Sequence, residues 1–466
     1  MEKRKSLTQL SLLALPILLG TWAYQRFYLQ SHLAVGAPSQ SSPPTLPVSQ
    51  PEQSAITQLE NAVTQAPQDV AKRWQLADTF QKIGQLEGAK KQLQTIVALR
   101  PKDSAGHLAL ANLHTALGEI NEAEQNYRTC LRLSVKSSEA WLGLASTLYH
   151  QNRFLEALEA ARRGSVLAPD DPNGSIILAS TALDFATQFP DPHKTKSQEL
   201  ALAKRHFLKA VTKWPNQGQL HLRLGTTNLA LGDAPSAIKN LRRARELMPD
   251  QATPVIMLGR AFIKARQRDG AKKHVEGAVL QFPDNAELHN MLSILWRGSN
   301  EAQGRQKSYE FIRKAVELEP DNAEYQETLG LAALRVQKTE EARLAFERSL
   351  KLNPYGRVPY LQLAAINNQL GQAKSATAYA KKSTENNARE SELRKLENLA
   401  AAFPQNAAVR ATLASWYATR GFLPAARDTY LQALRLDPKN QRIKKRLLEV
   451  QSKIKSASAP KSVAVS

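Results

Sequence analysis

A helix-turn-helix pattern that recurs along the chain constrains the fold more than any other feature of this sequence. It is clearest between residues 406 and 438. Apolar and small residues there follow one helix face, a glycine interrupts them, a second helix face follows, and a proline closes the unit: Leu413, Ala414 and Tyr417; Gly421; Ala426, Tyr430 and Ala433; Pro438. Residues three and four apart share one side of a helix, so each half of the unit has one face to bury.

Prolines at regular intervals show how often the unit returns. They are Pro67, Pro101, Pro169, Pro215, Pro249, Pro283, Pro320, Pro354, Pro404 and Pro438. Pro215, Pro249 and Pro283 are 34 residues apart, and Pro101 and Pro169 are separated by twice that number. One such unit cannot bury its own apolar face, so a fixed period of this kind predicts stacked repeats. We expect about ten units between residues 55 and 438.

The units resemble the tetratricopeptide repeat, in which large, small and aromatic residues and a closing proline follow one another over 34 residues. Small residues at Ala414 and Ala426 let two antiparallel helices approach closely, while Tyr417 and Tyr430 fill the space between them. The resemblance implies an all-α fold: a right-handed superhelical solenoid of helix-turn-helix tetratricopeptide repeats.

Departures from the period predict the domain organisation. We expect a basic segment (1–6), a membrane anchor (7–28) and a Pro/Ser-rich linker (29–54) before the repeats. A long repeat stack (55–383), a hinge (384–390) and a short repeat stack (391–438) should follow, and then a capping helix (439–456) and a disordered tail (457–466). The hinge is predicted from the polar run TENNARE. About 12 extra residues around Phe189 and His193 are expected to loop out, and a smaller insertion is expected near Gly298.

The amino-terminal apolar run has two interpretations. Residues 7–24 carry no charge and follow Lys3, Arg4 and Lys5. Their length is close to the roughly 20 residues that span a bilayer, and aromatic residues gather at the far end as they do at a membrane interface. A cleaved signal peptide is the alternative, because its apolar region needs only about 7–15 residues. We favour an uncleaved single-pass anchor with a cytoplasmic amino terminus, which in a bacterium would place the repeats in the periplasm.

The charge is strongly basic, with 63 Lys and Arg against 42 Asp and Glu and a net charge of +21. Basic doublets recur on the second helices: Lys90 and Lys91, Arg162 and Arg163, Lys204 and Arg205, Arg242 and Arg243, Lys272 and Lys273, Arg313 and Lys314, Lys381 and Lys382. The resemblance places second helices on the convex side, so the doublets would form a basic ridge. A solvated helix face and a contact with anionic lipid or polymer are both open interpretations. Nucleic acid is not expected, because the doublets lack interleaved aromatic residues.

The resemblance also implies where a partner would bind. Tetratricopeptide repeats hold extended peptides or helices in a concave groove lined by first helices. The residues at the matching positions are mixed in charge: Asp78, Asn112, Ser146, Tyr149, Thr226, Arg260, Arg297, Asn368 and Ser415. They predict a protein or peptide partner without naming it.

No motif indicates catalysis, a cofactor or a metal site. The sequence has no glycine-rich phosphate loop, no Gly-x-Ser-x-Gly elbow and no His-Glu-x-x-His. His107, His221 and His289 fall at one position in different units, which predicts packing rather than metal binding. Cys130 matches a small-residue position and is expected to be buried and inert.

Together, these features predict a membrane-anchored scaffold for protein–protein interactions. We expect it to serve assembly of a bacterial envelope complex, such as one for secretion, pilus formation or polysaccharide export. A periplasmic chaperone-like adaptor for exported chains and a eukaryotic organelle-surface receptor are the alternatives.

Overall fold

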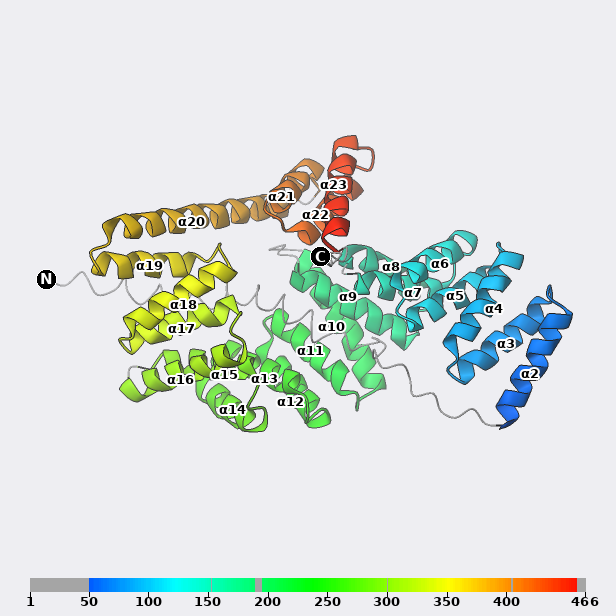
Figure 1. Cartoon of the computed structure of the whole chain (residues 1–466), viewed down its shortest axis with the longest axis horizontal. Coiled ribbons are helices and arrows are strands. Elements are labelled where there is room, and N and C mark those ends of the chain that lie inside the picture. The colour runs from blue at the N-terminus through cyan, green and yellow to red at the C-terminus, as the bar shows by residue number, and fades with distance from the viewer. Residues whose placement is uncertain (1–49, 152, 189–194, 300, 404, 459–466) are drawn as a thin grey trace, which may run out of the picture. The chain divides into compact units, whose positions relative to one another are not determined.

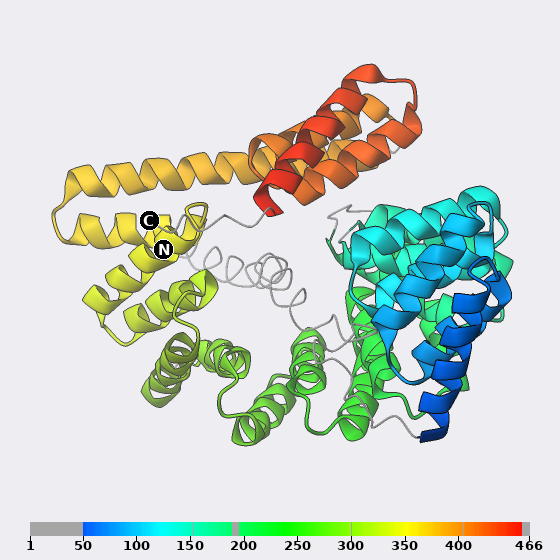
Figure 2. The ribbon, with the colours of Figure 1, turned by 45° about the vertical axis from the view of Figure 1, so that its right-hand side comes forward.

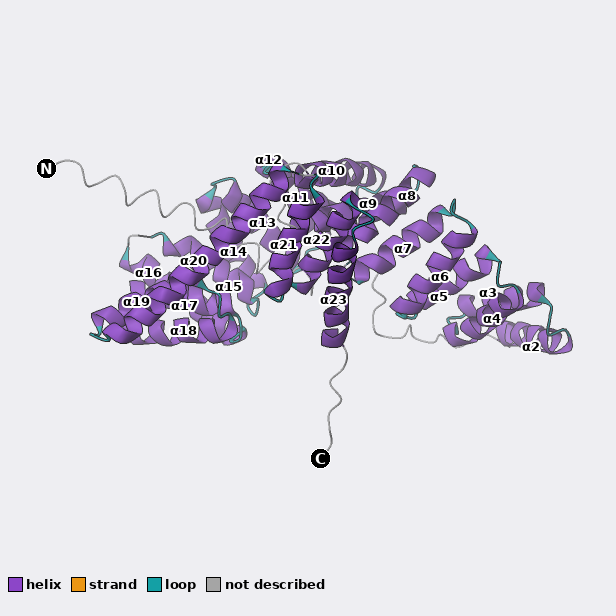
Figure 3. Ribbon diagram, turned by 90° about the horizontal axis from the view of Figure 1, so that it is seen from above, coloured by secondary structure: helices purple, strands orange, loops and turns teal. Residues whose placement is uncertain are grey.

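In the computed structural model, the described residues are 50–151, 153–188, 195–299, 301–403 and 405–458, and every element in them is a helix (Figure 1). The chain divides into two compact units after Gln188. The expectation of an all-α fold is confirmed, as Figure 3 shows by colour.

The first unit contains α2 and three helix pairs, followed by α9. Its helices are α2 (Gln50–Gln65), α3 (Val70–Lys82), α4 (Leu86–Leu99), α5 (Ser104–Ala116), α6 (Ile120–Leu133), α7 (Ser138–His150), α8 (Phe154–Leu167) and α9 (Pro172–Gln188). The two helices of each pair pack against each other, α3 with α4, α5 with α6 and α7 with α8. Ile56 and Val63 of α2 are buried in the same core as α3 and α4, so α2 covers the first pair.

The second unit starts with α10 and continues through six pairs to a terminal helix. Its helices are α10 (Thr195–Lys213), α11 (Gly218–Ala230), α12 (Ala234–Leu247), α13 (Ala252–Lys264), α14 (Arg268–Gln281), α15 (Ala286–Arg297), α16 (Ala302–Leu318), α17 (Ala323–Arg335), α18 (Thr339–Leu352), α19 (Arg357–Gln369), α20 (Ala373–Ala402), α21 (Ala407–Thr419), α22 (Leu423–Leu436) and α23 (Gln441–Ser458). Figure 2 shows α11 to α19 following one another pair by pair. Within the described residues, nine helix pairs pack in this way, three in the first unit and six in the second, and α9 and α10 fall in different units.

The turns inside the pairs require a left-handed backbone. Five of them place a glycine there, with φ between 72° and 82°: Gly84, Gly118, Gly232, Gly371 and Gly421. Glycine adopts this conformation without the steric penalty that a Cβ brings. Arg266 and Gln337 occupy the same place with φ of 60° and 62°. The turn geometry of the repeat is therefore kept even where the sequence does not supply glycine.

A polar side chain near the start of many first helices closes the turn before it. The side chain donates to the backbone carbonyl six residues earlier at 2.8–3.0 Å: Arg73 to Pro67, His107 to Pro101, Trp141 to Val135, His221 to Pro215, His289 to Pro283 and Gln326 to Pro320. Each of these bonds gives a partner to a carbonyl in the turn that joins two repeats. The shared position of the three histidines is thus explained by a structural role.

The insertions are accommodated mostly by longer helices. Standard first and second helices here have 13 and 14 residues, whereas α9 has 17 and α10 has 19. Most of the extra residues around position 190 are therefore helical, which corrects the expectation that they loop out; Phe189 and His193 themselves lie outside the described residues. The second insertion lengthens α16 to 17 residues.

The predicted hinge at residues 384–390 is wrong as a local structure. These residues lie inside α20, a continuous helix of 30 residues. The run contains no glycine or proline, and its polar residues cost a helix only a few tenths of a kcal/mol each. Tyr379 of α20 packs on the core of α17 to α19, whereas Leu396 and Ala400 pack on α21 and α22. One helix thus closes the long stack and opens the short one (Figure 1).

The two ends of the chain agree in part with expectation. The predicted capping helix is α23, whose Ile443, Leu447 and Val450 are buried against α21 and α22. Residues 459–466 of the predicted tail lie outside the described residues. The predicted anchor and most of the linker also lie outside them, and the last residues of that linker belong to α2. Among the described helices, none has both the length and the apolar character needed to cross a membrane.

Candidate protein-binding surface

The surface carried by the first helix of each pair is the candidate site, and we call it the first-helix face. In the first unit it belongs to α3, α5 and α7, and in the second unit to α11, α13, α15, α17, α19 and α21. The nine residues predicted to line the groove all lie on these helices. Their surroundings differ strongly along the chain.

In the first unit, α5, α6, α7 and α9 line an open cavity of about 450 Å³. Asn112 and Ser146, both predicted, line it together with Tyr127 and Glu139. Tyr127 Oη donates to Asn112 Oδ1 at 2.7 Å, and Asn112 Nδ2 donates to Glu139 Oε1 at 2.8 Å. Burial raises the pKa of Tyr127, so its hydroxyl remains a donor at neutral pH. Cavities of this size with a few fixed polar groups hold small ligands or side chains.

A missing side chain makes room for this arrangement. A Cβ on Gly143 would lie 2.3 Å from the Tyr127 ring, which real structures do not allow. Leu142 and Ile177 add apolar surface to the same cavity. The lining therefore combines apolar side chains with hydrogen-bond donors and acceptors, as a site for a peptide side chain requires.

The other predicted groove residues are divided between surface and interior. Asp78 is exposed and paired with Lys82 at 2.6 Å, and Asn368 is also exposed. Tyr149 donates to Asp184, while Ser415 is half-buried. Thr226 is 2% exposed, and its hydroxyl donates to the Leu222 carbonyl. Thr226 is therefore a packing residue in this structure, since a hydroxyl on a helix can bond the carbonyl one turn earlier.

In the second unit, neighbouring first helices bring carboxylates together. Arg260 of α13 pairs with Glu287 of α15, and both act electrostatically on Glu324 of α17. Burial raises the pKa of Glu324 to about 7, and Glu287 adds to this effect. Burial also raises the pKa of Glu327 to about 7, with Glu324 contributing. Within the described residues, neither Glu324 nor Glu327 has an ion pair or a hydrogen bond to its carboxylate.

Arginines gather at the other end of the same helices. Arg297 ends α15 and is half-buried. Arg268 donates to the Leu295 carbonyl, and Arg335 donates to the Ser299 carbonyl at 3.2 Å, so both guanidinium groups lie close to the end of α15. Burial lowers the pKa of Arg297, and the positive charges of Arg335 and Arg268 lower it further, while Glu327 opposes them. Arginine still keeps its proton at neutral pH.

The repeat pattern predicts Arg260 and Arg297 as groove residues but does not point to Glu287, Glu324 or Glu327. Each of these glutamates stands in the first or second turn of its helix, where acidic residues are common and unremarkable. Their spacing along the chain carries no signal, because they come from different repeats. Only the packing of α15 beside α17 brings them together.

The basic doublets are largely neutralised within their own repeats. Lys90 pairs with Glu87 and Glu119, each at 2.8 Å. Other doublet residues also have acidic partners: Arg163 with Glu159, Lys204 with Asp233, Arg243 with Glu246, Arg313 and Lys314 with Glu317, and Lys382 with Glu385. Arg242 and Lys272 lie over the rings of Phe262 and Trp296. These contacts favour the interpretation of a solvated, internally paired helix face over a dedicated anion-binding ridge.

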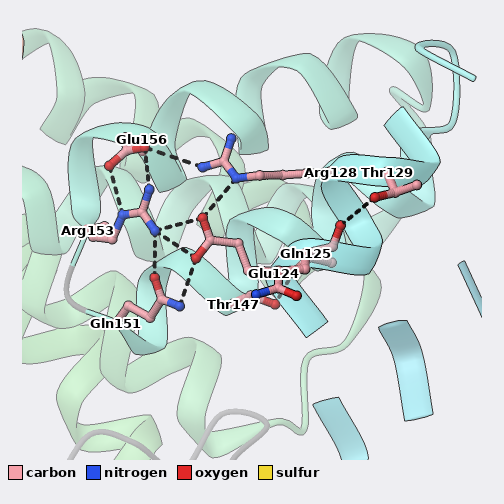
Figure 4. Close-up of polar contacts among 9 residues, drawn as sticks. Glu124, Gln125, Arg128, Thr129, Thr147, Gln151, Arg153 and Glu156 are labelled. Carbon is pink, nitrogen blue, oxygen red and sulfur yellow. Dashed lines mark hydrogen bonds and ion pairs between the residues drawn. The ribbon is translucent and has the colours of Figure 1, made fainter. Parts of the chain in front are cut away.

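The densest charged network of the first unit is also internal (Figure 4). Arg153, just before α8, pairs with Glu124 of α6 at 2.7 Å and with Glu156 at 2.6 Å, and Arg128 pairs with Glu124 at 2.8 Å. Burial alone would raise the pKa of Glu124, but Arg153 and Arg128 together lower it. The network joins two adjacent pairs and leaves no free charge for a ligand.

Comparison with protein families decides what kind of chain this is. Two models, both described as tetratricopeptide repeat, match residues 53–113 and 228–295 and residues 108–172 and 307–357. The chain belongs to the tetratricopeptide repeat family. Tetratricopeptide repeats bind protein partners, and proteins built from them are in general interaction scaffolds rather than enzymes. The repeat scaffold expected from the sequence is thereby confirmed.

Individual tetratricopeptide-repeat relatives are distant. The BBSome complex member bbs-4 of Caenorhabditis elegans is 26% identical over 173 residues, which are 36% of this chain and 37% of that protein. This chain thus spans little more than a third of the relative. Solved structures include the Cut9-Hcn1 hetero-tetramer of the APC/C, with 12% identity, a TM-score of 0.36, and coverage of 86% of this chain and 94% of the other. Human IFIT1 in a dimer with m7Gppp-AAAA has 17% identity and a TM-score of 0.40, with coverage of 82% of this chain and 94% of the other. The pilF protein of Pseudomonas aeruginosa has 19% identity and a TM-score of 0.37, with coverage of 50% of this chain and 96% of the other. Likeness at these identities concerns the fold alone.

Proposed function

We propose that this tetratricopeptide-repeat protein is a membrane-anchored scaffold that holds polypeptide partners on its first-helix face. The observation that carries the proposal is the open cavity of about 450 Å³ lined by α5, α6, α7 and α9. Its lining offers Asn112, Glu139 and Ser146 beside apolar Leu142, which matches the mixed chemistry of a polypeptide segment. The second unit adds a further set of half-buried charged groups on α13, α15 and α17.

The anchoring part of the proposal rests on the sequence. The apolar run at residues 7–24 follows Lys3, Arg4 and Lys5, and positive charge is retained on the cytoplasmic side of a membrane. We therefore place the repeats on the outer side, which is the periplasm in a bacterium. An envelope assembly would be the setting in which such a scaffold acts.

Two experiments test the two parts separately. A periplasm-dependent reporter fused after Ser466 should be active, and a reporter that works only in the cytoplasm would contradict the orientation. In-cell crosslinking followed by mass spectrometry should return one or a few stoichiometric polypeptide partners. A broad set of unrelated exported chains would instead support a chaperone-like adaptor, and the absence of any crosslinked polypeptide would contradict the scaffold.

A further inference from the structure

The first-helix face of α13, α15 and α17 is electrically divided into two ends. Glu287, Glu324 and Glu327 stand in the first two turns of α15 and α17. Arg297 and Arg335 stand at the last residues of the same two helices. Charges of opposite sign therefore lie at opposite ends of neighbouring parallel helices, and the two ends can be considered in turn.

The basic end has three guanidinium groups, and the only acidic group among the causes of the Arg297 pKa shift is Glu327, which acts on Arg297 through space without an ion pair. Within the described residues, Arg268, Arg297 and Arg335 form no ion pair, and Arg297 has no hydrogen bond. Arg335, and Arg268 from the start of the second helix α14, are held near Arg297 by carbonyls on either side of it, those of Ser299 and Leu295. Placing three like charges together and burying one of them is unfavourable unless an anion joins them. A carboxylate is the group whose geometry matches such donors.

The acidic end lacks donors in the same way. Glu324 and Glu327 have no ion pair or hydrogen bond among the described residues. Asn290 is only 6% exposed, and its side-chain oxygen is buried without a partner. Asn290 lies one helical turn after Glu287 and two turns before Arg297, so these residues share a face of α15. Two carboxylates without a donor on α17, and an unpartnered buried acceptor on the neighbouring α15, are groups that a donor would satisfy, and a Lys or Arg side chain supplies several donors.

The presence of acidic and basic groups on one face indicates which class of partner binds there. A polyanion such as a nucleic acid would meet Arg297 favourably but would be repelled by the carboxylates of Glu324 and Glu327 on the same face. A polypeptide can present both signs. Ile294, between the two ends, gives the segment an apolar surface to lie on.

We infer that this face binds a polypeptide segment carrying an acidic and a basic side chain, the acid at Arg268, Arg297 and Arg335 and the base at Asn290, Glu324 and Glu327. The inference rests on the proposed scaffold function. Asn290 and Arg297 are seven residues apart on α15, which corresponds to about 10 Å at about 1.5 Å per residue. An extended chain covers that distance in about three residues. The preferred segment therefore has its opposite charges about three positions apart.

The test is selection of peptides from a phage-displayed library of random sequences on the immobilised whole chain. Selected peptides should be enriched in an acid and a base about three positions apart. Arg297→Gln should weaken their binding about tenfold, the loss expected for one charge-assisted hydrogen bond. Arg297→Gln should have no effect on a peptide whose acid is already changed to the amide. The double variant Glu324→Gln and Glu327→Gln should act in the same way on the basic position.

Matched controls separate the possible results. Arg205→Gln on α10 and Glu276→Gln on α14 remove exposed charges from second helices and should leave affinity unchanged. Peptides that bind equally to Arg297→Gln, to the double variant and to the controls would overturn the two-ended site while leaving the scaffold intact. Tighter binding of polyphosphate than of any peptide would overturn the assignment to a polypeptide. If no peptide is selected at all, the scaffold function itself is contradicted together with this inference.

Discussion

Replacing Glu327 by glutamine tests the electrostatics of the first-helix face directly. Burial, with Glu324 nearby, raises the pKa of the Glu327 carboxyl from 4.5 to about 7. The native protein therefore binds more protons than the unfolded chain between these two pH values. Stability contributed by such a group is present at low pH and is lost as pH rises from about 4.5 to about 7.

The size of the effect follows from the shift. A change from 4.5 to about 7 corresponds to about 3 kcal/mol of penalty for the charged form above pH 7. Solvent reaches part of this half-buried side chain and reduces the penalty. We therefore expect Glu327→Gln to stabilise the protein by about 1–2 kcal/mol at pH 8 and to have little effect at pH 4.5.

Local stability is the quantity to measure, because repeat arrays unfold in parts. Amide hydrogen exchange of α15 to α18 should be slowed by Glu327→Gln at pH 8 and unchanged at low pH, after correction for intrinsic exchange rates. Glu276→Gln on the exposed side of α14 is the control and should show no difference at either pH. Equal effects of Glu327→Gln at both pH values, or destabilisation at pH 8, would refute the electrostatic reasoning.

Three further predictions concern the scaffold. Gly232→Ala should lower the free energy of unfolding by about 1 kcal/mol, because φ is 82° there; the backbone strain alone acts, since nothing lies within 4 Å of the added Cβ. Gly277 has equally open space but lies inside α14, so Gly277→Ala should raise the free energy of unfolding by up to about 1 kcal/mol. Chemical denaturation measures both changes. Arg153→Met should destabilise the first unit by about 2–3 kcal/mol at pH 7. Because Arg153 and Arg128 lower the pKa of Glu124, the difference should shrink at acidic pH as Glu124 takes up its proton, and a pH-independent loss would argue against the ion pair. His221→Phe should cost about 1 kcal/mol by losing the bond to the Pro215 carbonyl, and thermal unfolding identical to that of the unsubstituted protein would show that this bond is dispensable.

The repeat fold was predictable from the sequence because the small, large and turn-forming residues that determine packing all lie within each unit. Ala414, Ala426 and Tyr430 are buried where the pattern requires it, and Gly421 takes the left-handed turn. Cys130 is also buried as expected. These features depend on neighbours within one or two repeats, so local spacing determines them.

The errors arose where local composition was compatible with more than one structure. The polar run at residues 384–390 predicts a hinge, but because it contains no glycine or proline a helix continues through it. An insertion near residue 190 was expected to loop out, although helix extension satisfies its backbone hydrogen bonds better. Composition alone does not distinguish a solvated helix from a solvated loop.

The candidate site was only partly predictable for a different reason. Thr226 occupies a groove position but is buried, whereas Glu324 and Glu327 acquire their raised pKa values only through burial beside α15. Burial and proximity between repeats depend on how successive helices stack. Positions within a single repeat give no information about either.

The central claim is that partners bind on the first-helix face, and site-specific photocrosslinking tests it most directly. A photoreactive amino acid would be placed in the whole chain in cells at Ser146 and Ile294 on first helices, and at the exposed Glu276 and Arg205 on second helices. The account predicts crosslinks to the same polypeptide partner from the first-helix positions and none from the second-helix positions. Crosslinks only from Glu276 and Arg205, or equally from all four positions, would contradict it.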